Sequence, residues 1–226
     1  MNGRFPIDKI KAVIFDLDGT LIDSAYVWKR IDEEFLAKRG FEVPPDYAKK
    51  ISCLNFQTGA LYTIERFGLK ERAEDIIDEW FQMAVHEYRY NIKMNKDAAR
   101  FLRDLKAKGI KLALATASSP ALYNAVLENN DVAECFDAFS STEEVCRSKE
   151  HPDVYILAAG KLGCAVSECA VFEDIAEGVI SAKSAGFYVC AYIGNNKADN
   201  PDNELMRKTA DLTIGAYESV CGEVLV

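Results

Sequence analysis

The sequence predicts an α/β fold, a doubly wound and mainly parallel sheet core with an inserted all-helical region. Through the second half of the 226-residue chain, short apolar runs of β-forming residues alternate with amphipathic helical segments. This alternation is typical of a parallel sheet with helices on both faces. The first two apolar runs lie about ninety residues apart, far beyond an ordinary crossover, and only helical spacing fills the gap. An all-helical insertion accounts for that gap.

The first strand is predicted at residues 11–16, an apolar run that ends in acidic residues and a glycine, as a buried strand entering a loop would. From Ser24 the spacing becomes helical, with Val27, Ile31 and Phe35 on one stripe. Three stretches show helical spacing: 24–40, 51–67 and 73–90. We therefore assign residues 24–95 to a helical cap, and residues 1–23 and 96–226 to the core.

The rest of the chain supplies the remaining elements of the core. Helices are predicted near 97–108, 121–129, 153–162 and 176–185, and strands near 110–116, 136–139, 170–172, 187–192 and 212–214. If the first and fourth strands are neighbours, as in a doubly wound order, a crevice forms beyond their carboxyl ends. Acidic residues follow both of those strands.

Composition excludes several classes of function. The chain has 27 Lys and Arg against 36 Asp and Glu, a net charge of -9, which argues against nucleic acid or an anionic membrane as the main partner. No apolar run approaches the length of a membrane span, and residues 1–11 do not read as a secretory signal, so we expect a cytoplasmic protein. We further expect a monomer or weak homodimer. Seven cysteines without a C-x-x-C pair indicate free thiols, and two histidines argue against a zinc site.

Two acidic residues, Asp16 and Asp18, follow the first predicted strand. Residues i and i+2 at a strand end point the same way, so both carboxylates aim at one site. In a functional interpretation Asp16 is a nucleophile and Asp18 a general acid and then a base, with Gly19 permitting the turn between them and the next segment. The structural alternative is an ordinary Asp-Gly turn at the end of a strand.

A second acidic pair, Glu173 and Asp174, follows another predicted core strand. Four carboxylates within a few ångströms would raise one another's pKa values unless a divalent cation neutralised them, and oxygen ligands suit Mg²⁺. The charge count therefore implies a Mg²⁺ site made by Asp16, Asp18, Glu173 and Asp174. The structural alternative is that Glu173 and Asp174 cap the next helix.

Candidate phosphate-binding groups follow the second strand and precede a later helix. Thr116 ends its strand and is followed by Ala117, Ser118 and Ser119, and then by a helix opened by Pro120. Hydroxyls and free N–H groups at a helix start form a cradle for a phosphate. Lys149 would supply the cation that lets a carboxylate approach a phosphoryl dianion. A simple helix cap and a solvated surface lysine are the structural alternatives.

Together these segments resemble the haloacid dehalogenase-like hydrolases, specifically the subfamily with a helical cap between the first two motifs. β-Phosphoglucomutase and phosphoglycolate phosphatase belong to that subfamily. The resemblance spans almost the whole chain, and the order and spacing of the motifs carry it. The four motifs are matched by Asp16–Thr20 (D-x-D-G-T), by Thr116, by Lys149 ahead of Pro152-Asp153, and by Glu173-Asp174 with Gly178 downstream.

The resemblance implies a Rossmann-like core and in-line attack by Asp16 on a phosphomonoester, giving an aspartyl phosphate that water hydrolyses. Asp18 would protonate the leaving oxygen and later activate the water. Mg²⁺ would be held by the Asp16 carboxylate, the Asp18 backbone carbonyl and Asp174, with Glu173 nearby. Thr116, Ala117 and Lys149 would bind the phosphoryl group. The second Asp disfavours a dehalogenase.

The predicted cap departs from the family pattern. Trp28 stands where β-phosphoglucomutase-like chains usually carry His, and Cys53 and Phe56 stand where Gly and Arg are usual. A likely anchor for the second phosphate of a sugar bisphosphate is thereby lost. We therefore expect a Mg²⁺-dependent phosphatase of a small, sugar phosphate-like metabolite, with a phosphomutase as the alternative and a module without turnover as a third. Trp28 and Phe56 are the candidates for lining the substrate pocket.

Overall fold

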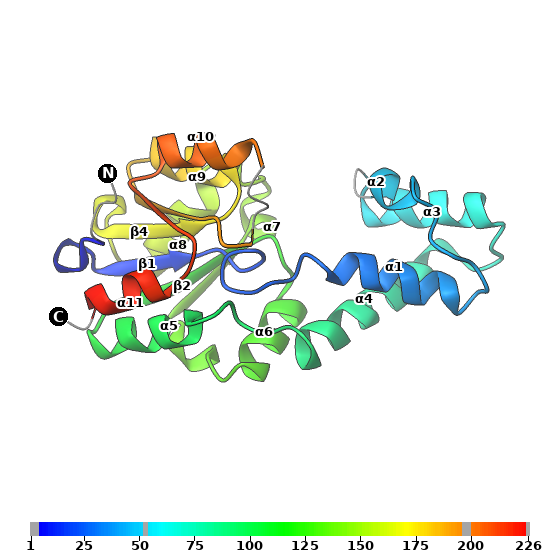
Figure 1. Ribbon diagram of the computed structural model, residues 1–226, viewed down its shortest axis with the longest axis horizontal. Coiled ribbons are helices and arrows are strands. Elements are labelled where there is room, and N and C mark those ends of the chain that lie inside the picture. Colours follow the sequence, from blue (N-terminus) through cyan, green and yellow to red (C-terminus); the bar gives the residue numbers. More distant parts are fainter. Residues whose placement is uncertain (1–4, 52–53, 196–199, 225–226) are drawn as a thin grey trace. The chain divides into compact units, whose positions relative to one another are not determined.

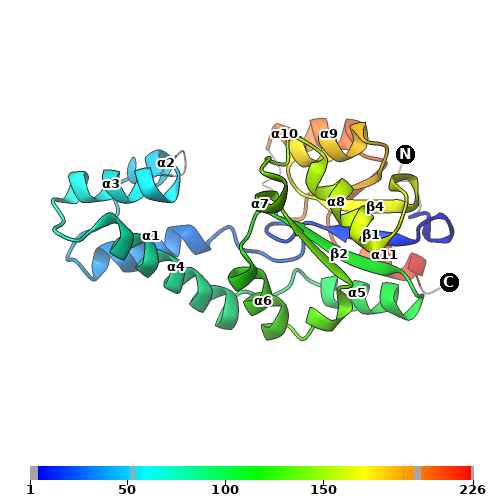
Figure 2. The same cartoon turned by 180° about the vertical axis from the view of Figure 1, so that it is seen from behind.

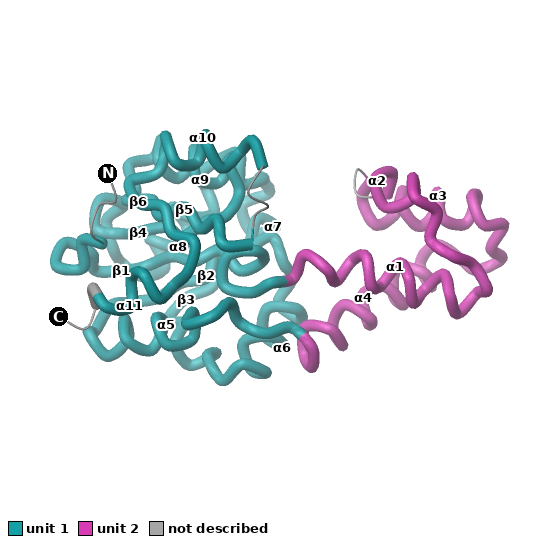
Figure 3. The backbone as a smooth tube through the Cα atoms, viewed as in Figure 1, with its two compact units in different colours: residues 1–23, 92–226 teal, residues 24–91 magenta. Residues whose placement is uncertain are grey.

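The computed structural model describes residues 5–51, 54–195 and 200–224. The chain forms two compact units, which Figure 3 distinguishes by colour: a core unit of residues 1–23 and 92–226, and a helical unit of residues 24–91. The helical unit ends at Asn91, whereas the predicted cap runs to Asn95. Asn95 belongs with the core because its backbone N–H donates to the Leu21 carbonyl at 2.8 Å. Cys53, singled out from the sequence, lies outside the described residues.

A six-stranded, all-parallel sheet forms the centre of the core unit (Figure 1). The strand order is β3-β2-β1-β4-β5-β6. This arrangement confirms the predicted α/β fold, including the adjacency of the first and fourth strands. The strands are β1 (Ala12–Phe15), β2 (Lys111–Thr116), β3 (Ala138–Ser141), β4 (Cys169–Glu173), β5 (Tyr188–Tyr192) and β6 (Leu212–Ile214).

Helices cover both faces of this sheet (Figures 1 and 2). Small side chains on one face, such as Ala113 and Ala191, let α8 and α9 pack closely. On the other face, aromatic rings of Phe15, Phe101 and Phe172 pack together in the core. The helices are α5 (Ala98–Ala107), α6 (Pro120–Asn129), α7 (Thr142–Val145), α8 (Asp153–Leu162), α9 (Ala176–Ser184), α10 (Asp202–Thr209) and α11 (Glu218–Val224), with 3₁₀ turns η1 (Ile7–Lys9), η2 (Ala133–Cys135) and η3 (Val166–Glu168).

Several boundaries differ from the sequence-based expectation. The strand predicted at 136–139 begins two residues later, because the η2 turn occupies the chain just before Phe136. The helix predicted over 51–67 begins later, at Phe56, because Asn55 caps its start by accepting the Thr58 backbone N–H at 2.9 Å. Four short helices, α2 (Tyr47–Ile51), α7, α10 and α11, were not predicted, because they are too short to show a clear period.

The helical unit contains four helices in its described part: α1 (Val27–Ala37), α2 (Tyr47–Ile51), α3 (Phe56–Phe67) and α4 (Ala73–Tyr90). Its core is aromatic: Phe35 and Trp80 meet edge to face, with ring centroids 5.4 Å apart. Among the described residues, no helix has both the length and the apolar character needed to cross a membrane.

Candidate active site

The parallel pairing of β1 with β4 brings the two acidic pairs to one edge of the sheet. Phe15 and Phe172 are partners in register, so Asp16 and Glu173 follow at the same level. The Asp16 backbone N–H donates to the Phe172 carbonyl at 3.0 Å and continues the ladder by one bond. Residues far apart in the sequence therefore meet because carboxyl ends of parallel strands share an edge.

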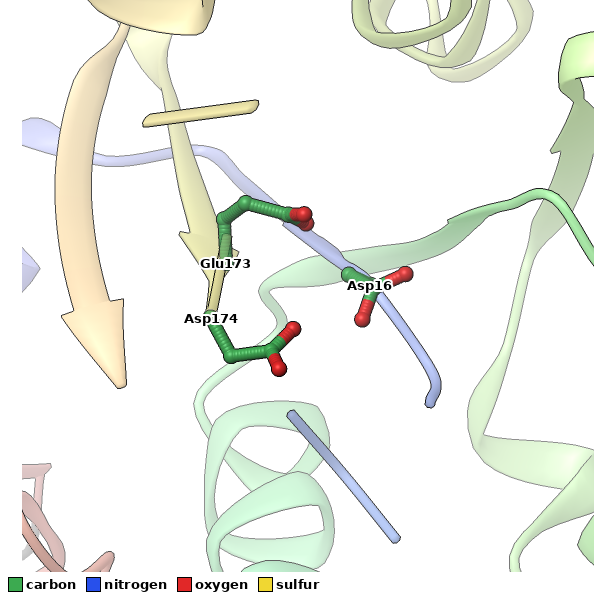
Figure 4. Close-up of side chains that lie close together, drawn as sticks. All are labelled: Asp16, Glu173 and Asp174. Carbon is green, nitrogen blue, oxygen red and sulfur yellow. The ribbon is translucent and has the colours of Figure 1, made fainter. Parts of the chain in front are cut away.

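Three carboxyl groups gather at this edge, those of Asp16, Glu173 and Asp174, and we call them the acidic cluster (Figure 4). One oxygen of each lies within 4.8 Å of the others. Asp16 and Glu173 are buried, and the Asp16 Oδ2 atom has no hydrogen-bond partner. A buried acceptor of this kind is costly to leave unpaired unless a ligand or ion takes it.

Lys149 supplies a positive charge to the acidic cluster from the loop before α8. Its Nζ donates to Asp16 Oδ1 and to Glu173 Oε2, the latter at 3.0 Å. Ser181 on α9 anchors the lysine backbone by donating its hydroxyl to the Lys149 carbonyl at 2.6 Å. The side chain is 8% exposed, so the interpretation as a solvated surface lysine does not describe it.

Burial dominates the ionisation of this cluster. Burial raises the pKa of Asp16, against the opposing effect of the Lys149 charge. Burial, reinforced by the charge of Asp16, raises the pKa of Glu173 well above its ordinary value and that of Asp174 to about 7. Burial alone would lower the pKa of Lys149, but the charges of Asp16 and Glu173 hold it well above its ordinary value. The site thus holds more negative charge than one lysine balances.

Gly19 lets the loop after β1 pass directly over Asp174. Its φ is +91°, and a Cβ atom there would lie 2.0 Å from Asp174 Oδ2. The next residue, Thr20, donates its hydroxyl to Asp174 Oδ1 at 3.1 Å. The glycine therefore serves both the backbone conformation and the close approach of the loop to the carboxylate.

Asp18 does not join the acidic cluster that the described residues form, contrary to the expectation that four carboxylates gather. Its Oδ2 atom instead accepts the Ser118 hydroxyl at 2.7 Å. The physical reason is that β1 ends at Phe15, so Asp18 already lies in the loop beyond the strand, where strand alternation no longer applies. The link to Ser118 nevertheless ties Asp18 to the loop that follows β2.

The loop after β2 carries the predicted phosphate-binding residues. Thr116 is buried at the strand end, and its Oγ1 atom accepts the Ser118 backbone N–H at 2.9 Å. Ala117 lies between them and is exposed. The Ser119 hydroxyl is buried without a hydrogen-bond partner just before α6. The loop is thus bound to the end of β2 and, through Ser118, to Asp18.

Sequence reasoning missed several residues that hold the site together. Ser181 holds the Lys149 backbone, and Ser118, expected only as one of the hydroxyls at the start of a helix, donates to Asp18. Asn95 donates its amide to the Thr20 carbonyl at 2.7 Å, and Asn195 donates to the Gly19 carbonyl at 3.1 Å. Nothing in the local sequence marks either asparagine, because their partners lie 75 and 176 residues away.

Trp28 and Phe56, predicted to line a substrate pocket, lie together within the helical unit. Their ring centroids are 5.5 Å apart in an edge-to-face arrangement, and both rings are about half exposed. They line a cavity of about 580 Å³ whose described lining residues all belong to the helical unit. We call it the helical-unit pocket.

The acidic cluster has the donor set for a hard divalent cation. It offers carboxylate oxygens, an unpartnered buried acceptor on Asp16 and raised carboxyl pKa values that a bound cation would reverse. The residues present therefore fit such an ion.

Comparison with known proteins agrees with this geometry. A model of the haloacid dehalogenase-like hydrolases matches residues 10–186. Hexitol phosphatase B from Escherichia coli K12 is 31% identical over 183 residues, covering 78% of this chain and 81% of that protein. β-Phosphoglucomutase from Bacillus subtilis is 27% identical over 219 residues, covering 91% and 92%.

Two further matches differ in coverage. The chain spans 47% of the length of a bifunctional riboflavin kinase/FMN phosphatase from Arabidopsis thaliana, with 31% identity over 79% of this chain. A solved structure from Thermotoga maritima, of a protein assigned as a β-phosphoglucomutase, aligns with a TM-score of 0.82 and 25% identity, covering 93% of this chain and 97% of that one. From the family match and these relatives we conclude that the chain belongs to the haloacid dehalogenase-like hydrolases.

Proposed function

We propose that this hydrolase is a Mg²⁺-dependent phosphatase that removes phosphate from a small, sugar phosphate-like metabolite through an aspartyl phosphate. The observation that carries the proposal is the placement of Asp16: one oxygen is bound by Lys149, and the other is buried without a partner. A carboxylate held in this way is oriented for attack on phosphorus.

In this mechanism the free oxygen of Asp16 forms a bond to phosphorus as the bond to the leaving oxygen breaks. Asp18, held by the Ser118 hydroxyl, gives its proton to that leaving oxygen. A water molecule then attacks phosphorus, loses a proton to Asp18 and breaks the bond to Asp16, which releases inorganic phosphate. The assignment of Asp18 as acid and then base restores both residues at the end of the cycle.

The phosphoryl oxygens are assigned to Thr116, to the backbone N–H of Ala117 and to Lys149. Mg²⁺ would be held by the carboxylates of Asp16 and Asp174 and the backbone carbonyl of Asp18, with Glu173 nearby. When bound, the ion would neutralise negative charge shared by the acidic cluster and the phosphoryl group. The helical unit is assigned the role of the cap, which selects the substrate. The name of the relative hexitol phosphatase B supports a phosphorylated carbohydrate-like substrate.

The direct test is phosphate release from p-nitrophenyl phosphate with Mg²⁺. We expect Asp16→Asn to abolish turnover, because the amide is a poor nucleophile, while Asp78→Asn, an exposed change of the same type, leaves turnover intact. A chelator should stop the wild-type reaction and added Mg²⁺ restore it. Unchanged turnover of the Asp16 variant would refute the assignment of the nucleophile.

A phosphomutase is the second candidate, favoured by the similarity to β-phosphoglucomutase over 91% of the chain. The aspartyl phosphate would then pass to another sugar hydroxyl instead of to water. A coupled assay that converts β-glucose 1-phosphate to glucose 6-phosphate separates the two. Conversion faster than phosphate release would favour the mutase.

A further inference from the structure

Asp32 on α1 is a carboxyl group that the site described above does not use. It lines the helical-unit pocket and is only 9% exposed. Among the described residues nothing donates a hydrogen bond to it or forms an ion pair with it, in contrast to the carboxylates of the acidic cluster. A nearly buried carboxylate without a partner is costly, so its retention calls for a ligand that compensates the charge.

The neighbours of Asp32 have their own partners. Thr63 donates its hydroxyl to the Gly59 carbonyl at 2.8 Å, so the Tyr47 hydroxyl, 2.8 Å from Thr63, must donate to Thr63. The Tyr47 proton is therefore unavailable to Asp32. Lys29 lines the same pocket, but its side chain is 76% exposed and lies 3.6 Å from Glu33. The described residues of the chain thus leave the negative charge of Asp32 uncompensated.

Burial, with a smaller effect of the neighbouring Glu33 charge, raises the pKa of Asp32 to about 6. At neutral pH the carboxyl is therefore still mostly ionised and offers acceptors only. A ligand that meets it must bring hydrogen-bond donors, and one with a positive charge gains most.

Apart from Lys29 and Asn55, the other described residues that line the pocket are apolar or aromatic. Ile51, Leu54 and Trp80 contribute walls, and the half-exposed rings of Trp28 and Phe56 stand beside them. Aromatic faces attract cations as well as apolar groups. At about 580 Å³ the cavity is of the size that takes a small organic ligand.

We propose that the helical-unit pocket binds an organic ammonium group, with Asp32 as its counter-ion and Trp28 and Phe56 as its aromatic walls. The described residues that line the pocket all belong to the helical unit, so we measure ligand binding there separately from turnover.

The binding test uses the fluorescence of the full-length chain, because both of its tryptophans, Trp28 and Trp80, line this pocket. Benzylammonium and benzyl alcohol serve as a charged and a neutral probe of nearly the same shape. We expect a saturable change in emission with benzylammonium and binding at least about tenfold weaker with benzyl alcohol, since only the ammonium pairs with Asp32.

Two variants distinguish specific binding at Asp32 from nonspecific binding. Asp32→Asn keeps the shape of the side chain and should remove the preference for the ammonium. Asp78→Asn removes the same charge from an exposed position on α4 and should keep it. No saturable change, equal binding of the two probes, or a preference that survives Asp32→Asn would overturn the proposal.

Discussion

The two units treat buried negative charge in opposite ways. In the core unit, Asp16 and Glu173 share the ammonium group of Lys149, and Thr20 donates to Asp174. In the helical unit, Asp32 is almost as deeply buried and has no such partner among the described residues. The core unit supplies part of the counter-charge from its own chain, through Lys149, which suits a site that must position reacting groups. In the helical unit we assign the counter-charge of Asp32 to a bound ligand, an arrangement that allows the pocket to discriminate between ligands.

The largest expected effect on stability and turnover comes from removing Lys149, the counter-ion of the core site. Lys149→Met leaves Asp16 and Glu173 buried without their counter-ion, so we expect unfolding to become easier by about 3–5 kcal/mol. Turnover of p-nitrophenyl phosphate should fall at least about 100-fold. Urea denaturation and the phosphate-release assay measure both.

The matched control is Lys208→Met, which removes an exposed lysine paired with Glu204. Its effect on stability should stay below about 1 kcal/mol, because surface pairs contribute little. If the two lysine variants lost stability equally, the buried ion pair would not have the role given to it here.

Gly19→Ala tests how tightly the core site is packed. The added methyl would collide with Asp174, so we expect turnover to drop about 100-fold through displacement of the carboxylate. Gly109→Ala shares the positive φ, at +77°, but has nothing within 4 Å of the added atom. It should lose only about 1–2 kcal/mol of stability to backbone strain and keep its activity. Equal activities of the two variants would contradict the close approach at Gly19.

Removing the charge of Asp32 from the helical-unit pocket should raise the stability of the protein, whereas removing that of Lys149 should lower it. The folded-state pKa of Asp32, about 6, lies above its ordinary value of 3.8, so the native state binds the proton more tightly. This group therefore favours folding below about pH 4, and its contribution declines as pH rises to about 6 and then stays level. Asn does not ionise, so Asp32→Asn avoids the stability that ionised Asp32 costs, and we expect the variant to be about 1–2 kcal/mol more stable at pH 7. This is less than the full pKa difference of Asp32 implies, because the pocket admits solvent.

Urea denaturation at about pH 7 and about pH 4.5 checks the sign, since the advantage should shrink at the lower pH. A variant that is less stable than the wild type at pH 7 would show that Asp32 has a stabilising partner in the free protein. In that case the contrast between the two units would disappear.

The smallest expected effect concerns Ser118, which donates its hydroxyl to Asp18. Ser118→Ala should lower kcat about tenfold with KM little changed, because the proposed acid and base loses the bond that orients it. Ser219→Ala is the matched control, since that exposed hydroxyl donates only to the Ala216 carbonyl at 2.7 Å and its loss should be neutral for turnover. Equal kcat values for the two variants would remove Ser118 from the description of the site.

The sequence by itself determined the order of the elements and the composition of the site. Alternation of apolar runs and helical stripes is local, so the parallel sheet and the extra helices between its first two strands could be predicted. Asp16 and Lys149 could be singled out because each stands in a motif. Helix ends and short helices such as α10 were not predictable, since single capping contacts and packing decide them.

Only the tertiary structure decided which groups meet. The register of β1 against β4 sets Asp16 beside Glu173, whereas Asp18, in the loop beyond β1, accepts a hydrogen bond from Ser118. Asn195 matters because it binds a residue distant in the sequence, and Asp32 because it has no partner among the described residues. No local sequence pattern indicates either fact. The physical reason is that hydrogen bonding and burial depend on neighbours in space, whereas sequence periodicity reports only which face of an element is apolar.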